Sequence, residues 1–150
     1  MKARSSKLLL EQLDQRLAMK YTQPPRGGWI CAIRKALRMS QRQLGKRLGI
    51  TAQGVKALEN NEANGAISLQ RLSEIANALN LELSYTFRTR DGSLQKLLEN
   101  TARKAATEIV RRTAISMSLE NQGNSAQRLK KAVQQKTEEF CREIPKHLWE

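Results

Sequence analysis

Basic and amide side chains, rather than any catalytic group, carry the chemistry that this sequence offers. The 150 residues hold 27 lysines and arginines against 14 acidic residues, for a formal net charge of +13. The excess is uneven, because residues 1–90 hold 16 basic and 6 acidic residues, whereas residues 91–150 hold 11 and 8. This surplus predicts an anionic partner that contacts the first ninety residues. DNA or RNA fits best, and a membrane surface is the weaker alternative.

Residues typical of catalysis or metal binding are sparse. His147 is the single histidine, and Cys31 and Cys141 lie far apart. These three do not form a zinc ligand set, and His147 has no paired nucleophile. No glycine-rich phosphate loop follows a strand. We therefore expect a binding protein with no catalytic residues, metal or cofactor, in which Cys31 is a small buried hydrophobic residue.

The chain has no long apolar run, so the sequence predicts no membrane span, and its first residues carry no apolar signal core. Two isolated cysteines are not typical of a secreted disulfide scaffold. We expect a reduced, cytoplasmic protein.

Residues 40–60 have the caps, glycines and leucines that two short helices need to pack at a steep angle. Ser40 and Gln43 form a capping-box pattern before a helix over 41–48, and Thr51 caps a second helix over 52–60. Gly49 suits a left-handed turn, and Gly45 is small enough for the two helices to approach closely. The shared core would hold Leu44, Leu48, Val55 and Leu58. This pattern predicts a helix-turn-helix.

The flanking sequence predicts a mainly α-helical fold. Helices are expected over 5–20, 29–38, 69–79, 93–120 and 125–143, and the 29–38 helix should turn Ile30, Ile33, Ala36 and Leu37 inward. Residues 81–89 alternate apolar and polar side chains, which predicts one short β-strand. The expected organisation is an N-terminal helix (1–23), a DNA-binding domain that includes the strand (24–90) and a C-terminal helical region (91–150).

The segment Ser40–Asn60 resembles the helix-turn-helix of Cro/C1-type (Xre) repressors, over roughly residues 28–80, with Gly45 in place of the more usual alanine. The resemblance implies that the start of the second motif helix faces base edges. Gln53 would pair with adenine, Ala52 or Ala57 would touch a thymine methyl, and Lys56 would reach guanine or a phosphate. Of the residues that the resemblance implies in DNA contacts, four would touch the DNA backbone: Gln41, Arg42, Lys46 and Asn60. The full set of implied contact residues is Gln41, Arg42, Lys46, Thr51, Ala52, Gln53, Lys56, Ala57 and Asn60.

A single module of this kind makes a small interface, so we expect a homodimer on a palindromic operator in double-stranded DNA. The two candidate dimer elements are the strand over 81–89 and the leucine-rich helix over 8–17. The alternative is that both elements cover the core of their own chain.

The end of the 93–120 helix carries Ser116, Glu120 and Asn121. This Ser-x-x-x-Glu-Asn resembles the inhibitory motif of antitoxins that restrain Fic-domain adenylyltransferases. That resemblance implies that the glutamate pairs with an arginine of the enzyme that would otherwise hold the ATP γ-phosphate.

The wider chain resembles the family called mobile mystery protein A, over most of residues 24–150. The matching segments are Arg26-Gly-Gly-Trp-Ile30, Met39-Ser-Gln-Arg-Gln-Leu44, Leu58-Glu59, Ile67-Ser-Leu69 and Pro145-Lys-His-Leu-Trp149. Members are typically encoded beside mobile mystery protein B, which carries a Fic domain. The resemblance implies a toxin–antitoxin module in which this chain is both autorepressor and Fic inhibitor. The alternative is a plain Xre-family repressor of a mobile element, with its C-terminal helices serving oligomerisation.

Overall fold

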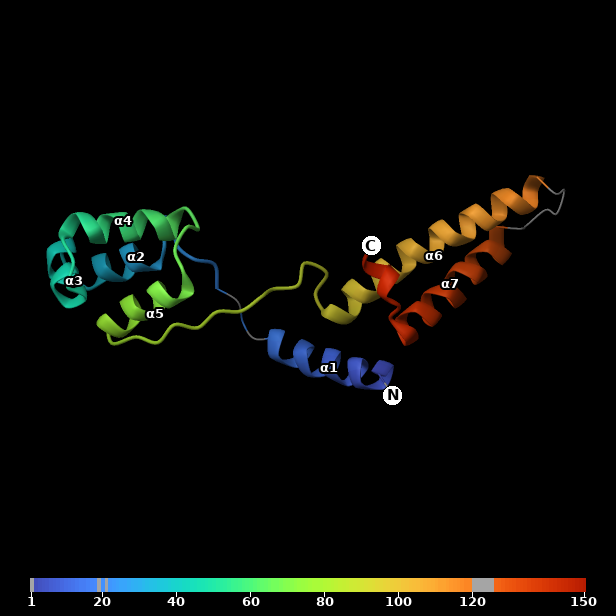
Figure 1. The fold of residues 1–150 in the computed structure, drawn as a ribbon, viewed down its shortest axis with the longest axis horizontal. Helices are drawn as coiled ribbons and strands as arrows, with labels where there is room; N and C mark the ends of the chain where they lie inside the picture. The colour runs from blue at the N-terminus through green and yellow to red at the C-terminus, as the bar shows by residue number, and fades with distance from the viewer. Residues whose placement is uncertain (1, 19, 21, 120–125) are drawn as a thin grey trace. The chain divides into compact units, whose positions relative to one another are not determined.

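The computed structural model describes residues 2–18, 20, 22–119 and 126–150, and their regular elements are helical (Figure 1). In chain order these are α1 (Lys2–Leu17), α2 (Trp29–Ala36), α3 (Gln41–Leu48), α4 (Ala52–Ala63), α5 (Leu69–Ala78), α6 (Leu94–Leu119), α7 (Ala126–Glu143) and the 3-10 helix η1 (Lys146–Trp149). The chain divides into two compact units. The α2–α5 unit is Tyr21–Thr86, and the α1–α6–α7 unit is Met1–Lys20 with Phe87–Glu150.

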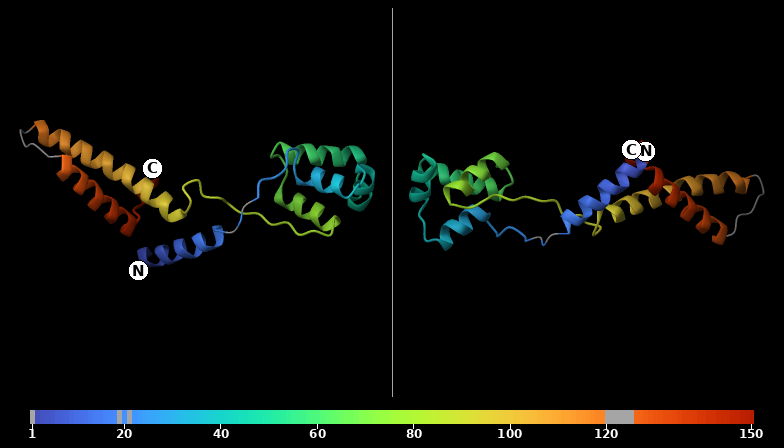
Figure 2. Two further views of the ribbon diagram at one scale, coloured as in Figure 1. Left: turned by 180° about the vertical axis from the view of Figure 1, so that it is seen from behind. Right: turned by 90° about the horizontal axis from the view of Figure 1, so that it is seen from below.

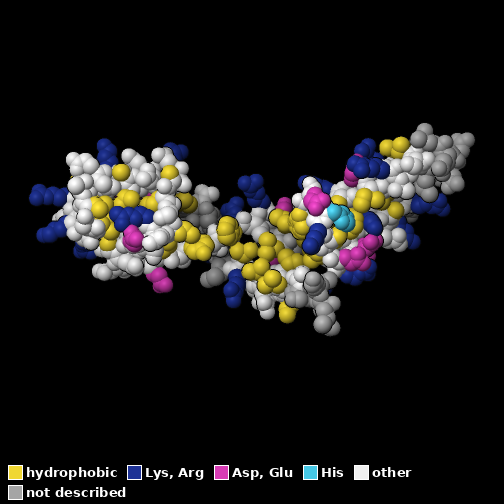
Figure 3. Space-filling view, viewed as in Figure 1, with side chains coloured by type: hydrophobic (Ala, Val, Ile, Leu, Met, Phe, Trp, Pro, Cys, Tyr) yellow, Lys and Arg dark blue, Asp and Glu magenta, His cyan; other side chains and the backbone are white. Residues whose placement is uncertain are grey.

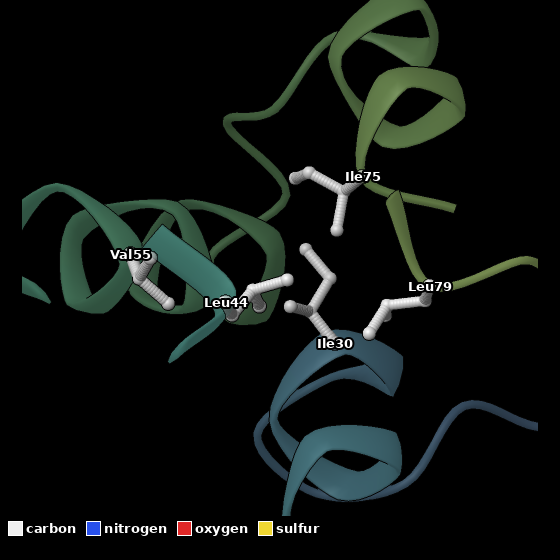
Figure 4. Packing of buried hydrophobic residues seen from close by; sticks show 5 residues of the cluster. All are labelled: Ile30, Leu44, Val55, Ile75 and Leu79. Atoms are coloured by element: carbon white, nitrogen blue, oxygen red, sulfur yellow. The ribbon is translucent and has the colours of Figure 1, made fainter. Parts of the chain in front are cut away.

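The α2–α5 unit has one small hydrophobic core to which each of its helices contributes. Figure 4 shows Ile30, Leu44, Val55, Ile75 and Leu79 pointing toward one another, and Leu44 and Val55 are fully enclosed. Leu48 and Leu58 pack against this cluster from its edge. The four leucine and valine positions expected to join the two motif helices are therefore confirmed in the core.

A long-range cap fixes the start of α2 against α4. The Glu62 carboxylate accepts hydrogen bonds from the backbone N–H groups of Trp29 at 2.8 Å and Ile30 at 2.9 Å. Gly28, the residue before the helix, has a φ of 88°, and a Cβ there would lie 2.5 Å from a Glu62 carboxylate oxygen. Glycine is thus needed at position 28 both for its backbone conformation and for the room that Glu62 occupies.

The α1–α6–α7 unit is built on an antiparallel pair of long helices, α6 and α7, which lie side by side in both views of Figure 2. Ala102 and Ala106 of α6 are completely buried, and these small side chains let Phe140 of α7 pack closely. Leu148 of η1 closes the same core. The helix α1 contacts α6, and its Asp14 carboxylate accepts hydrogen bonds from the N–H groups of the first two residues of α6, at 2.6 Å and 3.2 Å.

The β-strand expected over 81–89 is wrong, because these residues lie in no helix or strand. A strand exists only when a second strand accepts and donates its ladder hydrogen bonds, and alternation alone supplies none. The apolar members of the pattern stay largely in solvent, with Leu81 44%, Tyr85 69% and Phe87 77% exposed.

The expectation that Ala36 and Leu37 face inward is also wrong. The helix α2 ends at Ala36, Leu37 is 57% exposed, and Arg38 takes a left-handed φ of 54° that turns the chain toward α3. Arg34, one turn after Ile30, is buried in their place. No helix among the described ranges has the length and hydropathy needed to cross a membrane.

Candidate nucleic-acid interface

The turn between α3 and α4 has the geometry that its sequence predicts. The Ser40 hydroxyl accepts a hydrogen bond from the Gln43 N–H, and the Gln43 side chain accepts one from the Ser40 N–H at 2.8 Å, which completes the capping box. Gly49 ends α3 with a left-handed φ of 69°. The Thr51 hydroxyl accepts a hydrogen bond from the Gly54 N–H at 3.1 Å and so caps α4. The start and end of α3 and the start of α4 therefore each have a local physical cause.

Gly45 sets how closely the turn approaches α3. A Cβ at this position would lie 2.6 Å from the backbone oxygen of Ile50 and 3.2 Å from that of Thr51. The Gly45 carbonyl also accepts a hydrogen bond from the Ile50 N–H at 2.9 Å. The chain therefore folds back directly onto the glycine, and this contact positions the first residues of α4.

A buried ion pair ties α2 to α4. Arg34 donates from its guanidinium to both carboxylate oxygens of Glu59, with the Nη2–Oε2 distance at 3.2 Å, and also to the Met39 carbonyl at 2.9 Å. Gln41 donates its amide to the same carboxylate at 2.9 Å. Burial alone would raise the pKa of Glu59, but the hydrogen bonds from Arg34 and Gln41 outweigh burial, and the pKa is lowered. The charged form of Glu59 is thus the one that the fold requires.

One face of α4 is buried and the other is exposed. Val55 and Glu59 point into the unit, whereas Gln53, Lys56, Ala57 and Asn60 are exposed. The exposed residues follow the spacing of a single helical face, and Thr51 lies exposed just before it. Ala52 is half-buried at the first turn. The arrangement leaves a row of amide, ammonium and methyl groups accessible from outside.

The remaining residues singled out by the sequence lie on α3. Arg42 and Lys46 are exposed, and lysine and arginine side chains project around the part of this unit that carries α3 and α4 (Figure 3). Gln41 is half-buried because its amide contacts Glu59. Arg47, which was not singled out, donates to the Ala78 carbonyl at the end of α5.

The C-terminal motif is described only in part. Ser116 lies exposed near the end of α6, and its hydroxyl donates to the Arg112 carbonyl at 3.2 Å, one turn earlier. Glu120 and Asn121 lie outside the described residues. The structure therefore places the serine on a continuous helix and gives no geometry for the carboxylate.

Both cysteines are half-buried thiols with no disulfide. Burial raises the pKa of Cys141, and Glu99 nearby adds to the effect more than Arg103 opposes it. Within the described ranges, no cluster of histidine, cysteine and carboxylate side chains could hold a metal ion.

Sequence reasoning missed the two carboxylates that orient the helices, Glu59 and Glu62. A signal existed for the ion pair, because Arg34 and Glu59 each follow a buried apolar residue by four positions on an otherwise apolar stripe. Charges at such positions are rarely buried unless they are paired. The cap supplied by Glu62 had no comparable signal, because it acts on residues more than thirty positions earlier.

Comparison with protein families matches residues 32–85 to the model of a helix-turn-helix family. Neither the curated proteins nor the solved structures contain a significant match. The matched range spans α3, the Gly49 turn and α4, where the caps and the Gly45 contact were found. Residues 32–85 are thus an Xre-like helix-turn-helix domain, of the kind found in DNA-binding regulators.

Proposed function

We propose that this protein is a transcriptional repressor that inserts the start of α4 into the major groove of an operator. The observation that supports this most is the division of α4, whose inner face is anchored by Val55 and Glu59 while Gln53, Lys56 and Ala57 face outward. A recognition helix needs both properties, because base contacts lose discrimination when their scaffold moves. As a repressor of transcription, it would act in the cytoplasm.

Each outward side chain has a role that fits its chemistry. The Gln53 amide can donate to and accept from one adenine edge, and the Ala57 methyl fits against a thymine methyl. Lys56 supplies a cation to guanine or a phosphate. Gln41 has two amide hydrogens, of which Glu59 accepts one, so the second is the one that would reach a phosphate. Arg42, Lys46 and Asn60 would add contacts to the DNA backbone.

The decisive experiment selects duplexes from a random library with the full-length protein and then measures affinity for the selected sequence. Gln53→Ala should weaken that affinity about tenfold and leave affinity for an unrelated duplex unchanged, because a lost bidentate base contact costs about 1–3 kcal/mol. Lys56→Ala, if the lysine contacts phosphate, should weaken both affinities and reduce the salt dependence by about one charge.

Gln70→Ala is the matched control, because Gln70 is equally exposed but lies on α5, outside the motif. If Gln53→Ala and Gln70→Ala bind the selected duplex alike, α4 is not the reading helix. Circular dichroism of each variant checks that the helices remain intact.

A second role is supported by the α1–α6–α7 unit, whose described residues form a separate hydrophobic core. We propose that Ser116, Glu120 and Asn121 act as an inhibitory motif against a Fic adenylyltransferase, with this chain as the antitoxin. A glutamate carboxylate can take an enzyme arginine in a bidentate pair, and ATP then loses its γ-phosphate clamp. The competing role for this unit is oligomerisation of a plain repressor.

Co-expression with a Fic partner, such as one of the mobile mystery protein B type, separates these two roles. Glu120→Gly should release AMP transfer to the target, whereas Glu108→Gly, on α6, should keep the partner silent. Glu108 is a suitable control because its side chain is partly exposed and pairs with Arg111 and Arg112 of its own helix. Full silencing by Glu120→Gly would leave the oligomerisation role as the better account.

A further inference from the structure

The helix α1 is only partly covered by its own unit. Leu10 packs against the core of the α1–α6–α7 unit, whereas Leu8 is 57% exposed and Leu9 is 55% exposed. Figure 3 shows apolar side chains gathered over α1 and the first turns of α6. Contiguous apolar surface of this kind normally marks the place where a protein contacts another molecule.

An apolar groove lies beside these leucines. It has a volume of about 300 Å³, and its accessible wall is apolar. The helix α1 contributes Leu9 and Leu13, which lie one turn apart, and α6 contributes Leu94 and Leu97. Trp149 of η1 also lines the groove and is 54% exposed. The unit therefore presents projecting leucines and an apolar recess on one patch.

The contacts within the unit indicate what kind of group this groove accepts. A leucine-rich helix, α1, already packs on α6 and lines the groove with it. A second copy of α1 exposes the same leucines and so has the matching chemistry. In a two-fold symmetric interface each copy contacts the other with the same surface, so one patch must carry both the projecting and the receiving groups. Leu8 and Leu9 project from this patch, and the groove lies next to them.

We propose that α1 and the adjoining groove form a homodimer interface, in which Leu9 of each copy packs against the groove of the other. The inference deepens the proposed function and rests on it only for its purpose, which is to bring two copies of α4 to a two-fold operator. The interface is tested without DNA. A monomer that binds DNA would overturn the interface alone, whereas a dimer that binds no DNA would overturn the repressor role alone.

Analytical ultracentrifugation of the full-length protein, from about 1 to 100 µM, measures the association. Leu9→Lys should raise the dimer dissociation constant roughly a hundredfold, because the symmetry places a charge in the apolar contact twice. Leu9→Ala should raise it roughly tenfold, because it removes apolar contact and adds no charge. Leu37→Lys is the matched control and should leave the constant unchanged, because Leu37 is 57% exposed but lies in the α2–α5 unit.

The fluorescence of Trp149 locates the contact, because this side chain lines the groove. In a Trp29→Phe background, which removes the tryptophan of the other unit, the emission should shift to the blue as the protein is concentrated. Leu9→Lys should abolish that shift. Added salt should strengthen the association, because each copy has a net charge of +13 and the contact is apolar.

A chain that stays monomeric throughout this concentration range would overturn the proposal, and the groove would then serve a different ligand. A dimer that Leu9→Lys leaves intact, that forms without a change at Trp149 or that salt weakens would also overturn it, because the interface would lie elsewhere. Circular dichroism checks that both Leu9 variants keep their helices. If Leu9→Lys loses helix, the tenfold effect expected for Leu9→Ala decides the matter.

Discussion

Gly45→Ala should destabilise the DNA-binding domain, although alanine is the better helix former. Within a helix, exchanging glycine for alanine normally stabilises by about 1 kcal/mol. Here the new Cβ would lie 2.6 Å from the Ile50 carbonyl oxygen, where a relaxed carbon–oxygen contact needs about 3.3 Å. The turn must therefore retreat by roughly 0.7 Å, and it must do so against the hydrogen bond from the Ile50 N–H to the Gly45 carbonyl. Overpacking of this kind costs about 1–3 kcal/mol, so we expect a net loss of roughly 1 kcal/mol.

Gly54→Ala is the matched control on the neighbouring helix. A Cβ there would lie 3.4 Å from the Ile50 Cδ1 atom and from the Thr51 hydroxyl, which is ordinary contact distance. The higher helix propensity of alanine should then dominate, and the free energy of unfolding should rise by up to about 1 kcal/mol. The two substitutions are chemically identical, and the structure predicts opposite signs.

Urea unfolding measures both variants, with Trp29 fluorescence as the probe of the α2–α5 unit. Trp149 lies in the other unit, so Trp149→Phe as the background keeps the two transitions apart. If Gly45→Ala stabilised the unit as much as Gly54→Ala, the close approach of the turn to α3 would be disproved. The account of how α4 is positioned would then fail with it.

Three further outcomes follow from the carboxylates that orient the helices. Glu59→Gln should lower the free energy of unfolding, measured in urea, by about 3 kcal/mol, because it leaves the Arg34 charge buried and poorly compensated. The double variant Arg34→Met, Glu59→Met should recover most of that loss, because it removes both charges. The lowered pKa of Glu59 means that its stabilising contribution is complete above the unfolded pKa near 4.3 and declines as the pH falls through the folded value. Acid titration of Glu59→Gln by circular dichroism should therefore show less loss of stability below pH 4.3 than the original, and an identical curve would contradict this. Asp14→Ala should lower the free energy of unfolding of the α1–α6–α7 unit by about 1 kcal/mol. Asp14→Asn should lower it much less, because asparagine still caps the first N–H groups of α6.

Features set by neighbouring residues could be predicted from the sequence. Ser40, Thr51 and Ser68 each cap the helix that follows them, and Gly49 takes the left-handed turn. These assignments depend on atoms within about four residues of one another, so the local sequence contains the whole cause.

Features that depend on distant partners could not be predicted. The alternation over 81–89 indicates a strand, but a strand also needs a ladder partner, which its own chain does not provide among the described residues. Helical spacing predicts Leu37 in the core, but the left-handed φ at Arg38, which arginine rarely adopts, ends the helix first. The burial of Arg34 is tolerable only because Glu59 arrives from twenty-five residues away.

The Asp14 cap of α6 has a consequence for the order in which the protein is made. The carboxylate leaves the ribosome about eighty residues before the N–H groups that it will bind. The whole helix-turn-helix domain is synthesised in the interval and carries its own core, so it can fold first. During that time α1 has exposed leucines and no helix to pack on. A nascent chain whose first ninety residues have emerged from the ribosome would therefore already hold a complete helix-turn-helix, joined to an amphipathic segment that chaperones could bind.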